Sequence, residues 1–155
     1  GHPSPRQSFR RCWPGRAAAA GTGAETWRPG AFVRLEPDGR VVVISKHTEM
    51  GQGVFTTLAL AVAEELDVPW RSVAVETEPA DPKFAHLHSK FQMTGGSSST
   101  REALESMRLA GGTARAVLVQ AAAERWGVAV ERLRTKAGQV LADDGRTAAY
   151  GSLLA

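Results

Sequence analysis

Two glycine-rich turns contain the residues whose types and spacing could do chemistry. The first consists of Gly51, Gln52 and Gly53, and the second includes Gly95, Gly96, Ser97, Ser98 and Ser99. Each turn stands directly before a stretch with helical period. A helix N-terminus exposes unpaired N–H groups with a partial positive charge, and glycine lets a ligand oxygen approach the backbone that presents them. Both turns are therefore candidate anion-binding sites.

The side chains of the two turns suit different parts of a ligand. Gln52 can donate and accept hydrogen bonds at once, which suits an amide-edged ring or an oxo group. The consecutive hydroxyls that begin at Ser97 suit phosphate oxygens. Neither turn matches GxGxxG or a Walker sequence, which disfavours an ordinary dinucleotide or nucleoside triphosphate fold. The alternative is that both are only structural turns, since glycine before a helix often serves the turn alone.

Other side chains with chemical potential are less well supported. His86 and His88, near Asp81, could bind a metal, but no third ligand follows at a defined spacing. We therefore assign no metal ligands and no catalytic residues. His47 and Glu49 could transfer protons, although a solvated strand end is the favoured interpretation.

A Ser/His/Asp triad could also be assembled from Ser97, His86 and Asp81. No GxSxG sequence supports it.

The elements around the turns follow from hydrophobic period. Residues 31–45 alternate apolar and polar side chains on both sides of Pro-Asp-Gly, which predicts a β-hairpin. Helical spacing follows over residues 54–66, and alternation over residues 71–80 predicts a third strand. Residues 79–98 have no period and form a long loop, which is typical of functional or disordered segments.

A long helix should follow this loop. Ser99 and Glu102 match a capping box, in which Ser99 is the N-cap and Glu102 bonds back to a free amide. The helix is predicted to reach Trp126, and Gly111-Gly112 within it indicates close packing of another backbone. Its predicted buried face comprises Leu104, Met107, Gly111, Ala114, Leu118 and Ala121.

The remaining residues complete an α+β layout. Two short strands are expected around residues 143–145, and a further helix begins at Tyr150. Trp70 and Trp126 are expected in the core. The order is thus β-hairpin, helix, strand, long loop, long helix, β-hairpin, within one folded unit over residues 31–155.

Residues 1–30 have the composition of a disordered basic leader. Five arginines precede residue 30, so most of the formal charge of +3 belongs to this segment. Arg10-Arg11 resembles a degraded twin-arginine export signal, because Pro14 and Arg16 interrupt the expected apolar region. The location is therefore left open between cytoplasm and periplasm. Cys12 is the only cysteine, and no run is apolar enough to span a membrane.

Three blocks of this sequence resemble one known family. They are AFVRLEPDGRVVVISKHTEMGQGVFTTLALAVAEELDVPW, then VAVETEPADPK, then MTGGSSSTREALESMRLAGGTARAVLVQAAAERWGV. Together they resemble the molybdenum-binding large subunit of the xanthine dehydrogenase and aldehyde oxidase family, and are most similar to the isoquinoline 1-oxidoreductase beta-subunit type. The resemblance covers about residues 30–155, as an N-terminal portion of a larger molybdopterin-binding domain.

The resemblance implies a cofactor and partners. It implies that Gln52 and its flanking glycines contact the pterin or its pyrophosphate. Residues 94–99 would bind the phosphates and nucleotide end of molybdopterin cytosine dinucleotide. Such enzymes hydroxylate N-heterocycles or aldehydes with oxygen from water, and pass electrons to iron–sulfur clusters on a small partner subunit. The family's GxGE-like segment with its catalytic glutamate is absent from these 155 residues, so we expect no hydroxylase activity from this chain without the rest of the large subunit.

A different class of function remains as the alternative. The chain could be a small α+β binding module whose basic leader engages an acidic partner or nucleic acid. Interleaved aromatic residues are few in the leader, which disfavours nucleic acid as a partner.

Overall fold

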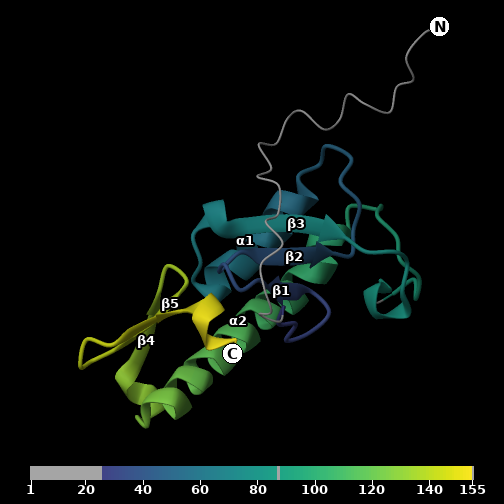
Figure 1. Cartoon of the computed structure of the whole chain (residues 1–155). Coiled ribbons are helices and arrows are strands. Elements are labelled where there is room, and N and C mark those ends of the chain that lie inside the picture. The colour runs from purple at the N-terminus through teal and green to yellow at the C-terminus, as the bar shows by residue number, and fades with distance from the viewer. Residues whose placement is uncertain (1–25, 87, 155) are drawn as a thin grey trace, which may run out of the picture.

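The fold is a three-stranded sheet packed on two helices, with a second small sheet beside them (Figure 1). The computed structural model describes residues 26–86 and 88–154. Most of the predicted leader lies outside these residues. Residues 26–30 are described, and within them Trp27 pairs with Leu35 and packs against the core.

The first sheet confirms the predicted hairpin and third strand. β1 (Val33–Leu35) pairs antiparallel with β2 (Val41–Ser45), and β2 pairs parallel with β3 (Val73–Thr77). Gly39 turns the hairpin with φ of 84°, which glycine adopts without a steric penalty. Every residue of β2 is buried, because this central strand is covered on both faces.

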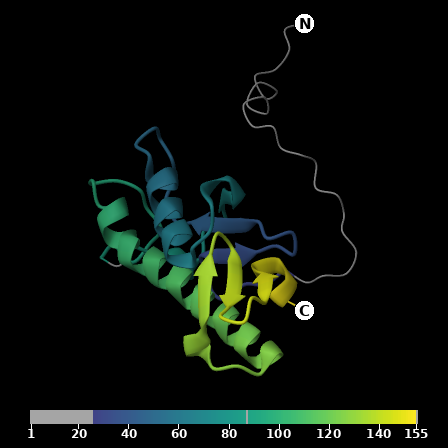
Figure 2. The ribbon, with the colours of Figure 1, turned by 90° about the vertical axis from the view of Figure 1, so that its left-hand side faces the viewer.

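The helices cover one face of this sheet and lie side by side (Figures 1 and 2). α1 is Val54–Leu66, as predicted, and α2 is Ser99–Trp126. The core lies between the sheet and the two helices, and includes Leu58, Val62 and Met107. A smaller apolar cluster of Val42, Ile44 and Phe84 covers the opposite face of the sheet.

Gly111 confirms the predicted close approach of another backbone. A Cβ atom at Gly111 would lie 2.7 Å from the carbonyl oxygen of Val62 in α1, so only glycine fits this helix crossing. Gly112 has open space by comparison, with its nearest neighbour atom at 3.9 Å. The predicted buried face of α2 is confirmed at Met107, Gly111, Ala114 and Leu118. Leu104 is exposed, and Ala121 is only partly buried.

The second sheet has one strand more than predicted. It contains β4 (Leu133–Lys136), β5 (Gln139–Ala142) and β6 (Thr147–Ala149), all antiparallel. The chain then forms a short 3-10 helix over Tyr150–Leu153. Figure 2 shows this sheet beside α2.

The expectation that both tryptophans are core residues is wrong for Trp70. Its side chain is 46% exposed at a 3-10 turn before β3. Trp126 is partly buried against the core, as expected. No helix in the described part of the chain is both long and apolar enough to cross a membrane.

Candidate functional site

The fold brings the two glycine turns together at the N-termini of α1 and α2. Between them lies a cavity of about 390 Å³, here called the inter-turn cavity. It is lined by Met50, Gln52, Val54, Thr94, Gly95, Ser97, Ser99 and Thr100. The two loops are joined directly, since the Thr48 amide donates to Thr94 Oγ1 at 2.7 Å. Residues far apart in the sequence thus form one surface.

The first turn is organised around Glu49, which follows β2 and precedes α1. Its carboxylate accepts hydrogen bonds from the amides of Gly51 (2.8 Å), Gly53 (2.9 Å) and Phe55 (3.0 Å). Bonds from the amides of Phe55 and Gly53 hold the pKa of Glu49 below its usual value. The N-terminus of α1 is therefore occupied by a carboxylate of the chain itself, whereas the sequence suggested that a ligand anion binds these amides.

This arrangement explains why glycine flanks Gln52. Gly51 has φ of 97° and Gly53 has φ of 81°, in the left-handed region that other residues adopt only with strain. The turn bends the backbone so that its amides converge on Glu49. The same hydrogen bonds lower the pKa of the Glu49 carboxylate, which makes it a weaker base for the proton transfer considered for it.

Gln52 braces the same turn and still retains unused hydrogen-bonding capacity. Its Oε1 accepts from the Met50 amide at 2.6 Å, and its Nε2 donates to the Thr48 carbonyl at 2.9 Å. A primary amide offers two donor hydrogens and two acceptor lone pairs. One donor and one acceptor position therefore remain on a side chain that lines the inter-turn cavity and is exposed.

The second turn presents some of its hydroxyls to the cavity and turns another away. Ser97 lies in the left-handed region with φ of 51°, and both Ser97 and Ser99 line the cavity. Ser98 instead donates to the Gly95 carbonyl at 2.9 Å and contacts His86 Nε2 at 3.0 Å. Ser98 thus stabilises the turn from behind the cavity.

The predicted capping box does not form. The N-cap of α2 is Ser98, one residue earlier than predicted, and it makes no side-chain capping bond. The first amides of a helix have no partner within the helix. Ser99 and Thr100, in this first turn, lie along the inter-turn cavity.

Glu102 contacts two cationic side chains instead of its own backbone. Its carboxylate accepts from Lys46 Nζ at 2.5 Å and lies 3.2 Å from His47 Nε2. The three side chains, here called the buried charge cluster, are 5%, 1% and 3% exposed for Lys46, His47 and Glu102. The interpretation of His47 as a solvated strand end is therefore wrong.

His86 takes part in neither a metal site nor a triad. The Ser98 hydroxyl gives its proton to the Gly95 carbonyl, so His86 Nε2 must donate to Ser98 Oγ, while Nδ1 accepts from the His88 amide. Asp81 caps a short 3-10 helix by accepting from the Lys83 amide. No three His, Cys, Asp or Glu side chains among the described residues are grouped to hold a metal ion.

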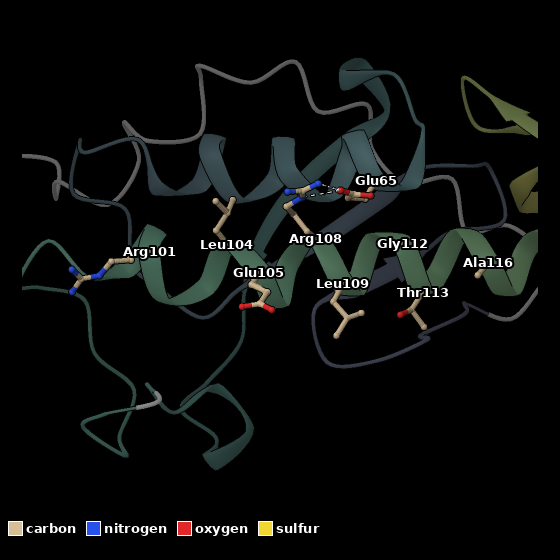
Figure 3. A pocket seen from close by; sticks show the side chains of 9 residues that line it. All are labelled: Glu65, Arg101, Leu104, Glu105, Arg108, Leu109, Gly112, Thr113 and Ala116. Carbon is tan, nitrogen blue, oxygen red and sulfur yellow. Dashed lines mark hydrogen bonds and ion pairs between the residues drawn. The ribbon is translucent and has the colours of Figure 1, made fainter.

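A larger hollow of about 660 Å³ lies along α2, where its lining runs from Arg101 to Ala116 (Figure 3). Its charged side chains include Arg108, which pairs with Glu65 of α1 at 2.6 Å. The lining is otherwise mostly apolar, with Leu104 and Leu109 projecting from α2. The larger hollow is lined by one hydroxyl, that of Thr113, whereas four hydroxyls are grouped in the inter-turn cavity, so the smaller cavity is the better candidate site.

Several residues of the site were not predicted from the sequence. Val54 lines the cavity, and Lys46 and Glu102 form the cluster behind it. One signal for Lys46 was available, because it follows a strand of consecutive apolar residues that is typical of a buried position.

Curated relatives match nearly the whole chain but are much longer. The beta subunit of isoquinoline 1-oxidoreductase from Brevundimonas diminuta is 40% identical over 147 residues, which cover 89% of this chain and 19% of the relative. A nicotinate dehydrogenase subunit from Pseudomonas putida is 34% identical over 126 residues, covering 79% of this chain and 10% of that protein. The chain therefore spans less than a fifth of the length of these relatives.

Solved structures share the fold. Quinoline 2-oxidoreductase from Pseudomonas putida 86 aligns with a TM-score of 0.58 at 23% identity, covering 79% of this chain and 15% of that one. Carbon monoxide dehydrogenase from Oligotropha carboxidovorans aligns with a TM-score of 0.61 at 23% identity, with 78% and 15% covered. The α+β arrangement is thus that of part of a larger domain.

The family comparison covers both glycine turns and all the described elements. The molybdopterin cofactor-binding domain family matches residues 9–155. This chain therefore belongs to the molybdopterin cofactor-binding domain family.

Proposed function

We propose that this chain supplies part of the cofactor site of a molybdenum hydroxylase, and that the inter-turn cavity receives the molybdopterin cofactor. The observation that supports this most directly is the convergence of two separated glycine turns on one cavity. A plain structural turn before a helix does not require a second such turn opposite to it. Membership in the cofactor-binding family gives the cavity its ligand class.

The residues that line the cavity fit a pterin with attached phosphates. Gln52 retains a donor and an acceptor for the edge of a ring. Thr94, Ser97, Ser99 and Thr100 offer hydroxyls on the opposite side, next to the uncapped N-terminus of α2. Because Glu49 occupies the amides at α1, we assign the ring to the first turn and the phosphates to the second.

The finer assignments rest on the resemblance described above. We propose the cytosine dinucleotide form of the cofactor, held by Gln52 in the first turn and by Gly95, Ser97 and Ser99 in the second. Gly51, Gly53 and Gly96 would shape the two turns through their positive φ angles. Ser98 would act indirectly, because its hydroxyl holds the turn. When bound, the molybdenum centre supplies the hydroxylation of an N-heterocycle or an aldehyde with oxygen from water. The relatives are named as subunits, which supports a multisubunit enzyme, and we propose a small iron–sulfur subunit as the partner.

We expect no hydroxylase turnover from the 155-residue chain alone. It spans 19% of the isoquinoline 1-oxidoreductase relative, and no residue lining the inter-turn cavity is a carboxylate or an imidazole that could act as a base. The measurement is oxidation of isoquinoline and of an aromatic aldehyde, with an artificial electron acceptor and added cofactor. Turnover above that of free cofactor would contradict this expectation.

The proposed function is tested by the binding of cofactor to the purified chain. We expect saturable binding of molybdopterin cytosine dinucleotide, with weaker binding of molybdopterin that lacks the nucleotide, because the second turn then loses part of its ligand. Equal affinity for the two forms would contradict the dinucleotide assignment. Absence of binding of either form to a chain that unfolds cooperatively would contradict the proposed function itself.

A further inference from the structure

The buried charge cluster has an excess of positive charge. Lys46 is a cation, and its contact with Glu102 at 2.5 Å is that of an ionised pair. The charge of His47 follows from its hydrogen-bond partners. Nδ1 faces the Met93 carbonyl at 2.9 Å, and Nε2 faces the Glu102 carboxylate at 3.2 Å.

Both of those partners are acceptors, so both nitrogens of His47 must donate. An imidazole with two donors is the doubly protonated cation. His86 provides a contrast within the same loop, because its bonding pattern is that of a neutral ring with one donor. With two cations and one carboxylate, the buried charge cluster therefore has a net charge of +1.

The other groups around His47 do not remove this excess. His86 lies beside it with a ring-centroid distance of 6.4 Å, and it is neutral by its hydrogen bonds. Lys46 also reaches the Ala85 carbonyl at 3.5 Å, which is a dipole without net charge. Glu49, two residues beyond His47, carries a negative charge, but the backbone amides of the first turn stabilise that charge, so it is not a partner of the cluster.

The cluster lies directly behind the wall of the inter-turn cavity. Met93, which accepts from His47, precedes the wall residue Thr94. Glu102 stands in the first turn of α2, shortly after the wall residue Thr100. Buried charge is costly unless it is compensated, and an anion in the adjoining cavity would provide that compensation.

We propose that the buried charge cluster is the electrostatic counterpart of a diphosphate group bound in the inter-turn cavity, and that Glu102 is a positioning residue that holds both cations behind the second glycine turn. This inference rests on the proposed function, which places the ligand in the inter-turn cavity. It adds the source of the positive charge, which none of the wall residues supplies, since all eight are uncharged.

Two substitutions separate the charge of the cluster from its geometry. Lys46→Met keeps the length and apolar stem of the side chain but lowers the net charge of the cluster to zero. Glu102→Gln keeps both hydrogen bonds if His47 gives up one proton. The oxygen of the Gln side chain would then accept from Lys46, and its NH₂ group would donate to Nε2 of His47. The net charge then stays at +1. Glu105→Gln is the matched control, an exposed glutamate on the same helix.

The first readout is binding of inorganic pyrophosphate to the full chain, followed by the amide NMR signals of residues 94–100. We expect Lys46→Met to weaken binding about ten-fold, a typical effect of one charge in a partly buried site. Glu102→Gln and Glu105→Gln should stay within about two-fold of the original chain. Thermal unfolding of each variant shows that it is folded under the conditions of the titration.

The second readout is the protonation of His47, measured from its ring nitrogens by NMR at neutral pH. We expect two ring protons in the original chain and in Glu105→Gln, and one proton, on Nδ1, in Glu102→Gln. A neutral His47 in the original chain would overturn the inference, as would an unchanged ring in Glu102→Gln. A merely structural role for Glu102 would not move this signal.

The outcomes also distinguish this inference from the proposed function. If cofactor binds but Lys46→Met leaves pyrophosphate affinity unchanged, the charge assignment fails and the proposed function stands. If cofactor binds but pyrophosphate does not, the diphosphate assignment fails alone. If the folded chain binds neither cofactor nor pyrophosphate, both proposals fail.

Discussion

Two glutamates near the glycine turns have opposite surroundings, and each determines what its turn can bind. Glu49 is held by backbone amides at the start of α1, whereas Glu102 is held by Lys46 and His47. The sequence could not show this for Glu102, because its local pattern is also that of a capping box. The choice depends on cations that the fold delivers from the end of β2, far away in the chain.

Replacement of Glu49 by Gln should lower the melting temperature by a few degrees. It should also change how the stability of the chain falls as the pH becomes acidic. The folded pKa of Glu49 is lowered, so its contribution to stability is present above its unfolded pKa of about 4.3 and is lost as pH falls through the folded value. Glu49→Gln removes this component and weakens the amide contacts. Thermal unfolding between about pH 3 and pH 7 measures both effects.

Glu64→Gln is the control for this experiment, because Glu64 is exposed on the same helix and lies near its C-terminal end. We expect little change, or a slight gain, from removal of a negative charge there. If the melting temperatures of Glu49→Gln and of the original chain fell identically at acid pH, the amides of the first turn would not hold this carboxylate.

At the scale of elements, the hydrophobic period and the turn residues were sufficient to predict the hairpin, α1 and the third strand. The hairpin, α1 at both of its ends, and the third strand follow from local patterns. The parallel pairing of the third strand with β2 was not predicted, because a local pattern does not specify the pairing direction. β4 was missed because it is a short strand that buries little surface. Trp70 was misplaced because its burial depends on neighbours that no local pattern specifies.

The α1–α2 crossing predicts opposite effects for two adjacent glycines. Gly111→Ala would place Cβ 2.7 Å from the Val62 carbonyl oxygen, and overpacking of this kind costs about 1–3 kcal/mol. Gly112→Ala meets open space and should stabilise the helix by up to about 1 kcal/mol. Denaturant unfolding of the two variants compares them directly. A stabilising Gly111→Ala would contradict the observed helix contact.

At the scale of the whole molecule, Tyr150 and Asp67 join the second sheet to the end of α1. The Tyr150 hydroxyl, which is buried, donates to the Leu66 carbonyl at 2.9 Å. Asp67 accepts from Thr135 Oγ1 at 2.7 Å, and its carbonyl accepts from the Gly138 amide at 2.7 Å. The two sheets are thus connected through one helix end, which a local sequence pattern does not reveal.

Tyr150→Phe should destabilise the chain by about 1–3 kcal/mol, because a buried carbonyl loses its partner. Burial raises the pKa of Tyr150 to about 12. The unfolded side chain ionises near pH 10, so stability is complete below that pH and falls as pH rises toward 12, by up to about 3 kcal/mol. Tyr150 is the only tyrosine, so the absorbance of tyrosinate reports its titration. Ionisation near pH 10 in the folded chain would contradict this environment.

The most direct test of the inter-turn cavity as the cofactor site is the affinity for molybdopterin cytosine dinucleotide of two tryptophan variants on α2. Thr100→Trp fills the inter-turn cavity, whereas Thr113→Trp adds the same side chain at an exposed position that lines the larger hollow instead. We expect Thr100→Trp to abolish binding and Thr113→Trp to bind like the original chain. Retained binding in a folded Thr100→Trp variant, or its loss only in Thr113→Trp, would place the cofactor elsewhere.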